Sequence, residues 1–463
     1  MATAVLQTCL RVPLTPEIQQ LIAELSIEQN QLSALADPST LVAYTIEETA
    51  AGTFVNLPKM WALDNLDKLG VTKIIGKQLP VTMLEDKDVV STIRQLRPHQ
   101  IEATKAVTKA FNTRYGGGAL LVLSCGMGKT VTALHIAATL KLKCLIITHT
   151  DVLASQWAAA IMQYYPKARV GKIQQNTFDV EDKTHVIASL KSVATRQYDM
   201  AGAGCGLLVV DEVHRIASLQ LHRAVANVGC KYRLGLSATP DRADGLSPFL
   251  KWGIGPVVYQ LERDPTPDLR IFGIMLDSGP VYPKVVRKNG KSVANIAGMI
   301  NLMTEDTDRA KMRQQVAAAW IRLCAKKGRK IIVLSDRIDL LKGLEKLMKD
   351  HVDGTSLLIG SAKRAVRDVA HLSQVILASY GIASEGFDVP SLDTIILLTP
   401  RSGANVITQC VGRIQRPGGK SPLVIDIVDS VGLFKGMFAK RCKVYEHLGG
   451  TITKYNERRE ILT

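Results

Sequence analysis

The 463-residue sequence lacks any cysteine arrangement that would indicate a disulfide framework or a structural metal. Its eight cysteines are scattered, none forms a CxxC pair, and no Cys/His cluster has zinc-ligand spacing. Several lie in apolar runs, where a free cysteine behaves as a small core residue. These absences exclude a disulfide-rich secreted scaffold and favour a reducing, intracellular protein.

Long hydrophobic runs are also missing. No stretch of about 20 apolar residues exists, so no membrane span is expected. The N-terminus, MATAVLQTCLRVPL, has no basic segment followed by an apolar one, so secretion is not expected. Apolar residues make up 46% of the chain and charged residues 22%. This ordinary globular usage excludes a long disordered protein.

Acidic residues are scarce relative to basic ones. The chain has 58 Lys and Arg against 42 Asp and Glu, a formal charge of +16. Residues 1–90 nevertheless carry 11 acidic and 6 basic side chains, a balance of −5, so the rest carries +21. This excess favours a polyanionic partner, most simply nucleic acid, bound by the body of the protein. The acidic balance of residues 1–90 favours a protein partner there.

The first 90 residues predict a small α+β accessory domain without visible chemistry. Residues 15–36 have apolar side chains near helical spacing. Residues 44–58 predict a hairpin that is followed by a turn at Pro58. At roughly 150 residues per domain, the length allows about two further domains.

From about residue 94, short apolar runs alternate with helical stretches, which predicts an α/β fold with parallel sheets buried on both faces. The first series of expected strands is 119–123, 144–148, 186–189, 207–211 and 232–237. The second series is 330–336, 355–360, 374–379, 393–400 and 423–429. We therefore expect an accessory domain at 1–90, a first lobe at 91–262, a connector at 263–300 and a second lobe at 301–463.

A phosphate loop is predicted at residues 124–130. The expected strand ending at Leu123 runs into Ser-Cys-Gly-Met-Gly-Lys-Thr and then into an apolar helix. Gly126 and Gly128 let backbone N–H groups turn around phosphate oxygens, aided by the helix N-terminus. Lys129 is expected to reach the β- and γ-phosphates of ATP, and Thr130 to bind Mg²⁺. The full motif has glycine where this chain has Leu123.

Adjacent carboxylates end the strand at 207–211. Asp211 is expected to bind Mg²⁺, directly or through water, and Glu212 to orient and deprotonate the attacking water. The next strand ends in Ser237 and, two residues on, Thr239, which could link the carboxylate loop to the neighbouring lobe. An ordinary turn is the alternative for the segment Ser237-Ala238-Thr239.

The second series contributes a basic segment. Gln409, Arg413 and Arg416 share one face if the segment is helical, and such a row could stabilise charge on the transferred phosphoryl group. Upstream, Gly386 allows a tight turn, and Asp388 is placed to touch the ribose or the arginines. A solvated basic face and an ordinary glycine turn are the alternatives.

These elements, in this order, resemble the superfamily 2 helicases and translocases over about residues 94–430. The resemblance rests on GMGKT, DEVH, SAT, the segment around SEGFD, and QCVGRIQR. LGLSATPDRADGL followed by GPVVYQL is similar to the XPB, UvsW-like phage and poxvirus transcript-release branch. DEVH in place of DEAD counts against a DEAD-box RNA helicase. The resemblance implies two tandem RecA-like lobes.

The resemblance also implies further site residues. Gln100, in LRPHQ, is the candidate adenine contact, and His214 joins the coupling residues Ser237, Thr239 and Gln409. The implied nucleic-acid contacts are Thr148, Gln156, Arg242, Thr399 and Arg401. Trp157, next to Gln156, is either a packed aromatic or a base-stacking one.

The sequence therefore predicts an ATP- and Mg²⁺-dependent helicase or translocase, acting on DNA more readily than on RNA. Three alternatives stay open. One is a duplex translocase or transcript-release factor that does not separate strands. The second is an RNA helicase. The third is a binding subunit without turnover, against which the intact Lys129, Glu212 and Arg413 argue.

Overall fold

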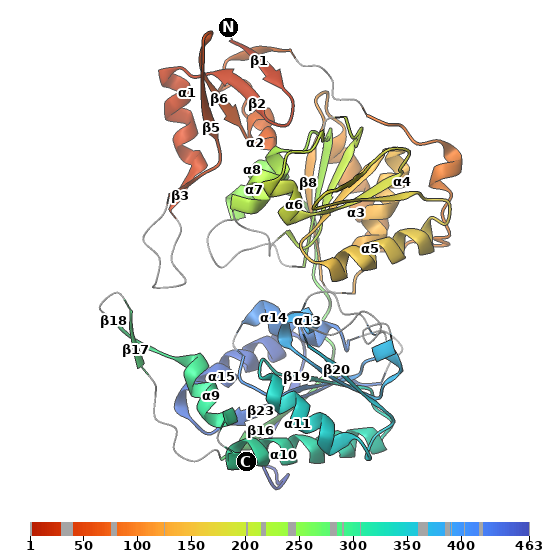
Figure 1. Ribbon diagram of the computed structural model, residues 1–463, viewed down its shortest axis with the longest axis vertical. Helices are drawn as coiled ribbons and strands as arrows, with labels where there is room; N and C mark the ends of the chain where they lie inside the picture. Colours follow the sequence, from red (N-terminus) through yellow and green to blue (C-terminus); the bar gives the residue numbers. More distant parts are fainter. Residues whose placement is uncertain are drawn as a thin grey trace. The chain divides into compact units, whose positions relative to one another are not determined.

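The structure is a computed structural model in which the chain forms two compact units, Met1–Arg263 and Asp264–Thr463 (Figure 1). The boundary falls one residue after the predicted end of the first lobe at residue 262. The described residues are 2–28, 40–75, 81–124, 126–200, 202–213, 219–238, 247–277, 285–288, 291–305, 307–359, 369–384, 389, 391–401, 403–415 and 420–462.

The accessory domain is a five-stranded sheet in the order β5-β6-β2-β1-β7, in which only β1 and β7 pair in parallel. The predicted hairpin is confirmed as β5 and β6. The sheet strands and the second helix are β1 (Ala2–Leu6), β2 (Leu10–Pro13), β5 (Thr45–Thr49), β6 (Gly52–Leu57), β7 (Val71–Ile75) and α2 (Lys59–Asp64).

The helix predicted at 15–36 is much shorter than expected. Thr15 caps α1 (Pro16–Leu21), which tightens into the 3₁₀ turn η1 (Ile22–Leu25). The chain then becomes extended, because β3 (Ser26–Glu28) pairs with β4 (Thr40–Val42). Strand pairing therefore overrides the helical periodicity beyond Leu25. The rest of the predicted helix lies outside the described residues.

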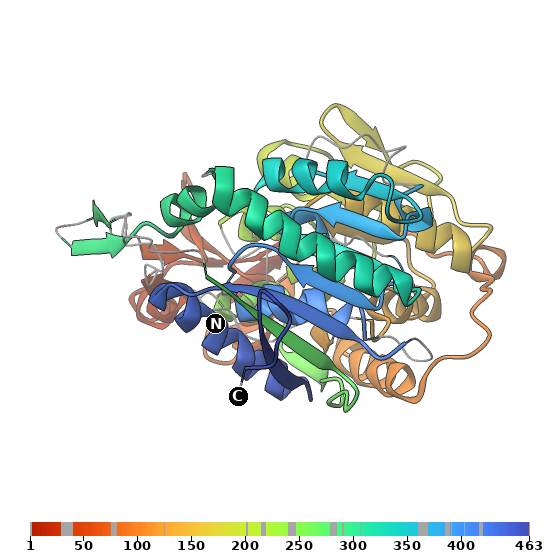
Figure 2. The same cartoon turned by 90° about the horizontal axis from the view of Figure 1, so that it is seen from below.

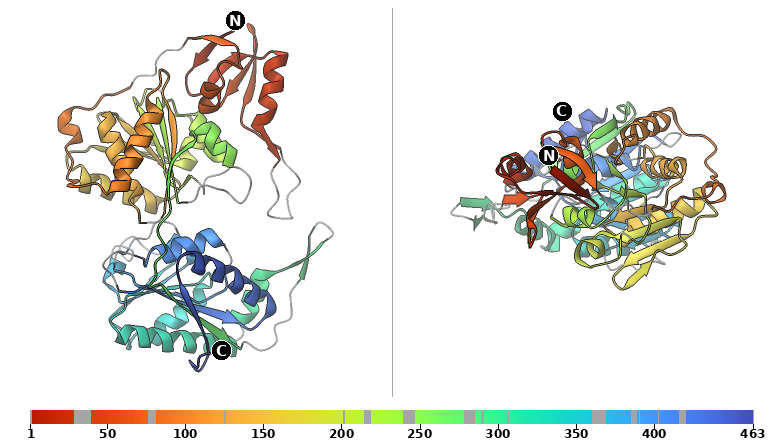
Figure 3. Two further views of the ribbon diagram at one scale, coloured as in Figure 1. Left: turned by 180° about the vertical axis from the view of Figure 1, so that it is seen from behind. Right: turned by 90° about the horizontal axis from the view of Figure 1, so that it is seen from above.

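The accessory domain is anchored to the first lobe by two buried cations. Lys59 Nζ, at the start of α2, donates to the carbonyl oxygens of Cys230 (3.0 Å) and Lys231 (3.4 Å). Arg233 donates to the Thr8 carbonyl in the β1–β2 turn (2.8 Å) and to the Gly253 carbonyl (2.7 Å). Seen from behind (Figure 3), this domain lies beside the first lobe, and its helix α2 contacts α8 (Ser247–Gly253).

The first lobe is an eight-stranded sheet in the order β11-β10-β12-β9-β13-β14-β8-β15. Every neighbouring pair is parallel except β10 and β11. All five strands predicted for the first series are confirmed. The strands are β8 (Gly118–Leu123), β9 (Cys144–Thr148), β10 (Val170–Gln174), β11 (Thr177–Asp179), β12 (His185–Ser189), β13 (Leu207–Val210), β14 (Tyr232–Ser237) and β15 (Val257–Leu261).

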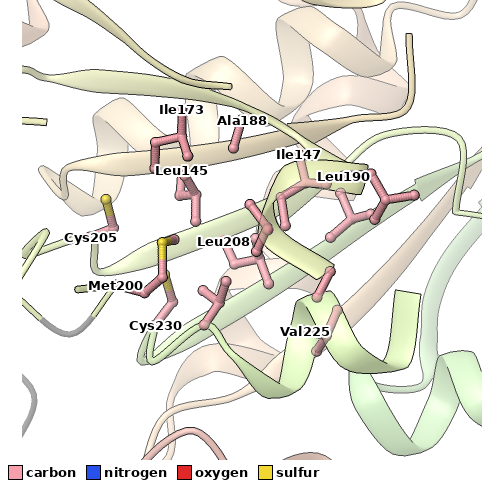
Figure 4. Close-up of a cluster of buried hydrophobic side chains, with 14 of the residues drawn as sticks. Leu145, Ile147, Ile173, Ala188, Leu190, Met200, Cys205, Leu208, Val225 and Cys230 are labelled. Atoms are coloured by element: carbon pink, nitrogen blue, oxygen red, sulfur yellow. The ribbon is translucent and has the colours of Figure 1, made fainter. Parts of the chain in front are cut away.

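Helices cover both faces of this sheet, so its strands are apolar on both sides. On β9, Leu145 and Ile147 pack into one cluster while Cys144 and Ile146 pack into the other. Figure 4 shows the first cluster, in which Val225 faces these strands. The helices are η2 (Asp86–Val89), α3 (Pro98–Phe111), α4 (Lys129–Leu140), α5 (Asp151–Tyr164), α6 (Leu190–Thr195), α7 (Leu219–Ala226) and α8 (Ser247–Gly253).

The second unit is a seven-stranded, fully parallel sheet in the order β20-β21-β19-β22-β23-β16-β24. The five strands predicted for the second series are confirmed. The strands are β16 (Arg270–Leu276), β19 (Ile331–Leu334), β20 (Thr355–Leu358), β21 (Val375–Ala378), β22 (Thr394–Leu397), β23 (Leu423–Asp429) and β24 (Thr451–Asn456).

The segment 263–300 is not a simple connector, contrary to expectation. Its strand β16 lies between β23 and β24 in the second sheet, because the apolar run from Ile271 to Leu276 is buried there. Only the start of the segment, up to Leu269, links the two sheets. Further on, β17 (Val285–Lys288) and β18 (Lys291–Ala294) form an antiparallel ribbon outside that sheet.

Helices also cover both faces of the second sheet (Figure 2). They are α9 (Ile296–Glu305), α10 (Thr307–Lys326), α11 (Ile338–Met348), η4 (Ala370–Leu372), α13 (Tyr380–Ser384), α14 (Ala404–Gly412) and α15 (Gly432–His447). None of the helices in the described ranges combines the length and apolar character that crossing a bilayer requires.

Candidate ATP site

The phosphate loop lies between β8 and α4, as predicted. Gly126 and Gly128 both have positive φ, at 79° and 84°, a conformation that favours glycine. A Cβ added to Gly128 would lie 2.5 Å from Nε2 of Gln100, so a larger residue there would displace the end of that side chain. Cys125, which precedes Gly126, lies outside the described residues. The backbone thus forms the tight turn that a phosphate cradle needs.

Lys129 begins α4 at the centre of the site. Its Nζ donates to the carbonyl oxygen of Leu123 at 3.1 Å and lies 3.9 Å from Oε1 of Glu212. Leu123 is the buried last residue of β8, so the position that departs from the full motif still belongs to the strand. The ammonium is held between this strand end and the carboxylate pair.

Asp211 is fixed by two hydrogen bonds. Trp157 Nε1 donates to Oδ2 at 2.8 Å, and the Glu212 backbone N–H donates to Oδ1 at 2.9 Å. Trp157, on α5, is 2% exposed. Of the two alternatives for Trp157, the packed aromatic is therefore correct. The sequence did not predict its hydrogen bond to Asp211. Its partner lies 54 residues away, so no local pattern signals the bond.

Burial dominates the electrostatics of Asp211. Desolvation and the neighbouring Glu212 raise its pKa to about 6, while the Trp157 bond and Lys129 act in the opposite direction. Glu212 has φ of +49°, in the left-handed region that costs a non-glycine residue roughly 1 kcal/mol. The turn after β13 therefore holds the Glu212 backbone in a sparsely populated conformation beside Asp211.

Side chains of the LRPHQ segment contact the backbone carbonyl oxygens of the phosphate loop. Gln100 accepts from the Arg97 backbone N–H at 2.9 Å and donates to the Gly128 carbonyl at 3.3 Å. Arg97 Nη1 donates to the Gly126 carbonyl at 3.2 Å, and His99 Nε2 lies 2.9 Å from the Met127 carbonyl. Adenine contact by Gln100 stays a prediction. The roles of Arg97 and His99 were missed, although both lie in the same motif.

The residues present fit a magnesium–nucleotide complex. Thr130 is the second residue of α4, two residues after Gly128, and Asp211 offers a buried carboxylate near Lys129. Hydroxyl and carboxylate oxygens are hard ligands of the kind that Mg²⁺ prefers. Thr130 and Asp211 would hold the ion, which when bound neutralises charge on phosphate oxygens.

The basic segment of the second lobe is only partly helical. Helix α14 ends at Gly412, and Arg413 is its half-buried C-cap, with its N–H donating to the Cys410 carbonyl at 3.1 Å. Gln409 is buried on α14. The predicted helical row through Arg416 is therefore interrupted, because Pro417 and Gly418 follow in the sequence and disfavour helix. Arg416 lies outside the described residues.

The predicted nucleic-acid contacts differ in exposure. Thr148 and Thr399 are 2% and 3% exposed, so their side chains are buried, whereas Gln156 and Arg401 are partly exposed. Ser237, predicted to be a coupling residue, is buried at the end of β14. The remaining predicted residues, His214, Thr239, Arg242, Gly386 and Asp388, lie outside the described residues.

Two parts of the chain match known protein families. Residues 93–242 match the family described as "Type III restriction enzyme, res subunit", and residues 314–418 match "Helicase conserved C-terminal domain". The first match contains the phosphate loop and both carboxylates, and the second contains Arg413.

Viral proteins are among the relatives of the chain. It is 29% identical to "Putative ATP-dependent RNA helicase L396" of Acanthamoeba polyphaga mimivirus, over 87% of this chain and 76% of that protein. It is 27% identical to "Putative ATP-dependent RNA helicase QP509L" of African swine fever virus (strain Badajoz 1971 Vero-adapted), over 79% and 75%.

The fold has a solved counterpart in S. cerevisiae Dbp5 bound to RNA and ADP BeF3. That structure matches with a TM-score of 0.54 at 13% identity, over 78% of this chain and 94% of that chain. The likeness confirms the expected pair of RecA-like lobes. Two helicase-type domains are matched, and viral proteins named putative helicases are among the relatives, so the chain is a helicase of superfamily 2 and an ATP-dependent enzyme.

Proposed function

We propose that this helicase uses ATP hydrolysis to move along DNA. The observation that carries the proposal is the cluster of Lys129, Asp211 and Glu212 at the end of β8 and β13, with Asp211 fixed by Trp157. Lys129 binds phosphate oxygens, Glu212 accepts a proton from the attacking water, and Asp211 with Thr130 holds Mg²⁺.

Arg413 supplies positive charge from the second lobe in this proposal. It follows α14 directly, so movement of that helix moves the guanidinium with it. Positive charge near the transferred phosphoryl group stabilises its transition state. Gln409, one turn earlier on α14, would couple this movement to the nucleotide.

The nucleic-acid substrate rests on a different observation. The SATPDRADG segment resembles the branch in which DNA translocases are found, which favours DNA. The printed names of the two viral relatives favour RNA as the second candidate. The charge of +21 outside residues 1–90 suits either backbone, with steep salt dependence and little sequence preference.

Steady-state ATPase rates separate these candidates. The rate is measured without nucleic acid and with single-stranded, duplex and branched DNA or RNA, at two salt concentrations. Lys129→Ala serves as the control for contaminating activity. We expect strong stimulation by DNA and little by RNA. Stimulation mainly by RNA would contradict DNA as the substrate but would still agree with ATP hydrolysis as the activity.

A forked duplex then distinguishes unwinding from duplex translocation. Strand release that depends on ATP supports a true helicase. Stimulation of ATPase by duplex DNA without strand release supports a translocase that displaces bound proteins or transcripts. The residues of the ATP site are the same for both activities, so the unwinding assay decides between them.

A further inference from the structure

Three buried side chains hold three backbone carbonyls of one short loop in the second lobe. The loop comprises residues 398–401 and connects β22 to α14. Arg313 Nη1 donates to the Leu398 carbonyl at 2.9 Å, Tyr380 Oη to the Thr399 carbonyl at 2.8 Å, and Arg441 Nη1 to the Arg401 carbonyl at 2.6 Å. The three donors come from α10, α13 and α15 and are at most 2% exposed.

Both arginines are themselves fixed by buried carboxylates on β23. Arg441 forms a two-pronged pair with Asp426, with Nε to Oδ2 at 2.7 Å and Nη2 to Oδ1 at 2.8 Å. Tyr445 Oη also donates to Asp426, at 2.8 Å. The fork geometry holds the Arg441 guanidinium in one orientation, with Nη1 left for the loop. Arg313 pairs with Asp429 through Nη2, which leaves its Nη1 for the loop.

The two carboxylates lie on opposite faces of the sheet. Side chains alternate along a strand, so Asp426 lies on the face of Val424 and Val428, and Asp429 lies on the opposite face. Val424 and Val428 belong to one apolar cluster and Ile425 and Ile427 to the other. The loop is therefore held from both helical layers at once. Such paired ions in an apolar core add little net stability but can specify one conformation.

The loop carries a candidate nucleic-acid contact. The Arg401 side chain is 42% exposed, pairs with Asp336 at 2.7 Å, and lies over the Tyr380 ring with 5.5 Å between Cζ and the ring centroid. Tyr380 thus touches the loop twice, through its hydroxyl at Thr399 and through its ring at Arg401. A guanidinium held on an aromatic face loses less freedom when it binds a phosphate.

We propose that Arg313, Tyr380 and Arg441 are positioning residues that hold the 398–401 loop so that Arg401 is preorganised for a backbone phosphate of the nucleic acid. This inference rests on the proposed function. The ligand class is a phosphodiester, and the bound phosphate would take the place of Asp336 as the partner of Arg401.

The test uses Tyr380→Phe in the full-length protein, because it removes one hydroxyl and keeps the ring under Arg401. Binding of a fluorescent single-stranded oligonucleotide is measured by anisotropy at several salt concentrations. We expect the dissociation constant to rise about 3- to 10-fold. Tyr165→Phe is the matched control, since its hydroxyl also donates to a buried carbonyl, that of Leu134, in the other unit. It should leave oligonucleotide affinity unchanged.

A double-mutant cycle with Arg401→Ala separates positioning from plain stability. Arg401→Ala alone should weaken binding and lower the slope of log affinity against log salt by about one. Tyr380→Phe should then have little further effect, because it acts through Arg401. An equal effect of Tyr380→Phe in both backgrounds would overturn the inference.

The remaining outcomes are distinguishable. If Arg401→Ala leaves affinity and salt slope unchanged, the proposed contact is wrong, and the positioning inference fails with it. If Arg401→Ala weakens binding and Tyr380→Phe does not, the contact stands and the positioning fails. Arg441→Lys provides a second variant that keeps the charge but loses the fork, and it should weaken binding in the same Arg401-dependent way.

Discussion

The hydrogen bond between Trp157 and Asp211 joins a core residue to the chemistry of the ATP site. The indole belongs to the apolar cluster between α5 and the sheet, while its N–H reaches the buried carboxylate. A carboxylate held at both oxygens cannot rotate away from the expected metal position. The same burial that fixes Asp211 also raises its pKa to about 6.

A pH dependence follows from that pKa. An acid with a raised pKa is neutral below it, so Asp211 loses its charge as the pH falls through about 6. We expect kcat/KM for ATP hydrolysis, which reports ionisation of the free enzyme, to decline below this pH. Trp157→Phe should move the decline upward by about one to two pH units, because a bond to the charged form is lost. An unmoved profile in a folded variant would show that the bond does not tune Asp211.

Lys129 is expected to be indispensable. Its Nζ lies between the end of β8 and Glu212, where it would meet the phosphates. Lys129→Ala should abolish ATP hydrolysis without changing the circular dichroism spectrum. Normal hydrolysis by a well-folded Lys129→Ala protein would make the phosphate-loop assignment wrong.

Arg413 should affect turnover more than affinity. Since it is proposed to stabilise charge in the transition state, Arg413→Ala should lower kcat by roughly 10³-fold or more and change KM for ATP little. Single-turnover hydrolysis and nucleotide titration measure the two effects separately. A loss confined to affinity would remove Arg413 from this role.

At the scale of elements, strand β14 contacts the accessory domain near its start and ends at a predicted coupling residue. Arg233 is the second residue of the strand and reaches the β1–β2 turn, while Ser237, predicted to be a coupling residue, is the last. Arg233 also donates to the carbonyl oxygens of Val225 and Val228, so it joins three parts of the first unit. Its side chain is 1% exposed.

Removing the guanidinium should destabilise the first unit. Arg233→Met keeps the bulk but leaves buried carbonyls without their donor, at a cost of about 1–3 kcal/mol. Urea unfolding of the variant measures this cost. Arg223→Met on α7 is a control, because that side chain is outside the buried anchor. Equal stability of the wild type and Arg233→Met would mean that water replaces the lost bonds.

Some elements could be predicted from sequence and others could not. Fully buried strands such as β9 and β22 have apolar runs that stand out, and all ten of the predicted strands were confirmed. Strand β24 was missed because it is half-exposed, with a mixed sequence. Strand β16 was missed because Pro- and Lys-rich segments flank its apolar run.

Some side chains of the ATP site and of the 398–401 loop region could likewise be predicted from sequence, and others could not. Lys129 follows the short loop after β8, and Asp211 and Glu212 follow β13 directly, so local motifs identify all three. The Trp157–Asp211 bond spans 54 residues and the Arg313–Asp429 pair spans 116, and neither separation leaves a pattern in the sequence. Side chains that orient a site through tertiary contacts therefore require the structure.

For the molecule as a whole, charge is unevenly distributed between its parts. The accessory domain is acidic and the remainder basic. A protein partner for residues 1–90 stays a prediction that rests on this contrast. The edge strand β5 of the accessory domain is exposed along all five residues. The acidic domain is nonetheless joined to the basic first lobe by carbonyl–cation contacts, of which Lys59 is the most sensitive to pH.

Stability of the first unit should rise between pH 7 and pH 8. Burial lowers the pKa of Lys59 from 10.5 to about 7, so in this window the unfolded chain binds a proton that the folded chain has lost. The expected gain is about 1 kcal/mol relative to Lys59→Met, measured by urea unfolding at both pH values.

The comparison stops at pH 8 because buried thiols act in the opposite direction. Burial raises the pKa of Cys205 from 9.0 to about 11. The contribution of this thiol to the free energy of unfolding therefore declines as the thiol of the unfolded chain ionises near pH 9. If the wild type and Lys59→Met respond identically from pH 7 to pH 8, Lys59 stays charged in its carbonyl site.

The last strand of the first lobe has a mechanical consequence. Strand β15 pairs with β8 as far as Leu123, the Ser124 N–H donates to the Leu261 carbonyl, and the Arg263 N–H donates to Ser124 Oγ. The chain passes to the second unit immediately afterwards. Tension applied to the linker is therefore transmitted first to the phosphate loop. In a single-molecule pulling experiment from the second unit, bound nucleotide should raise the force at which β15 peels from β8.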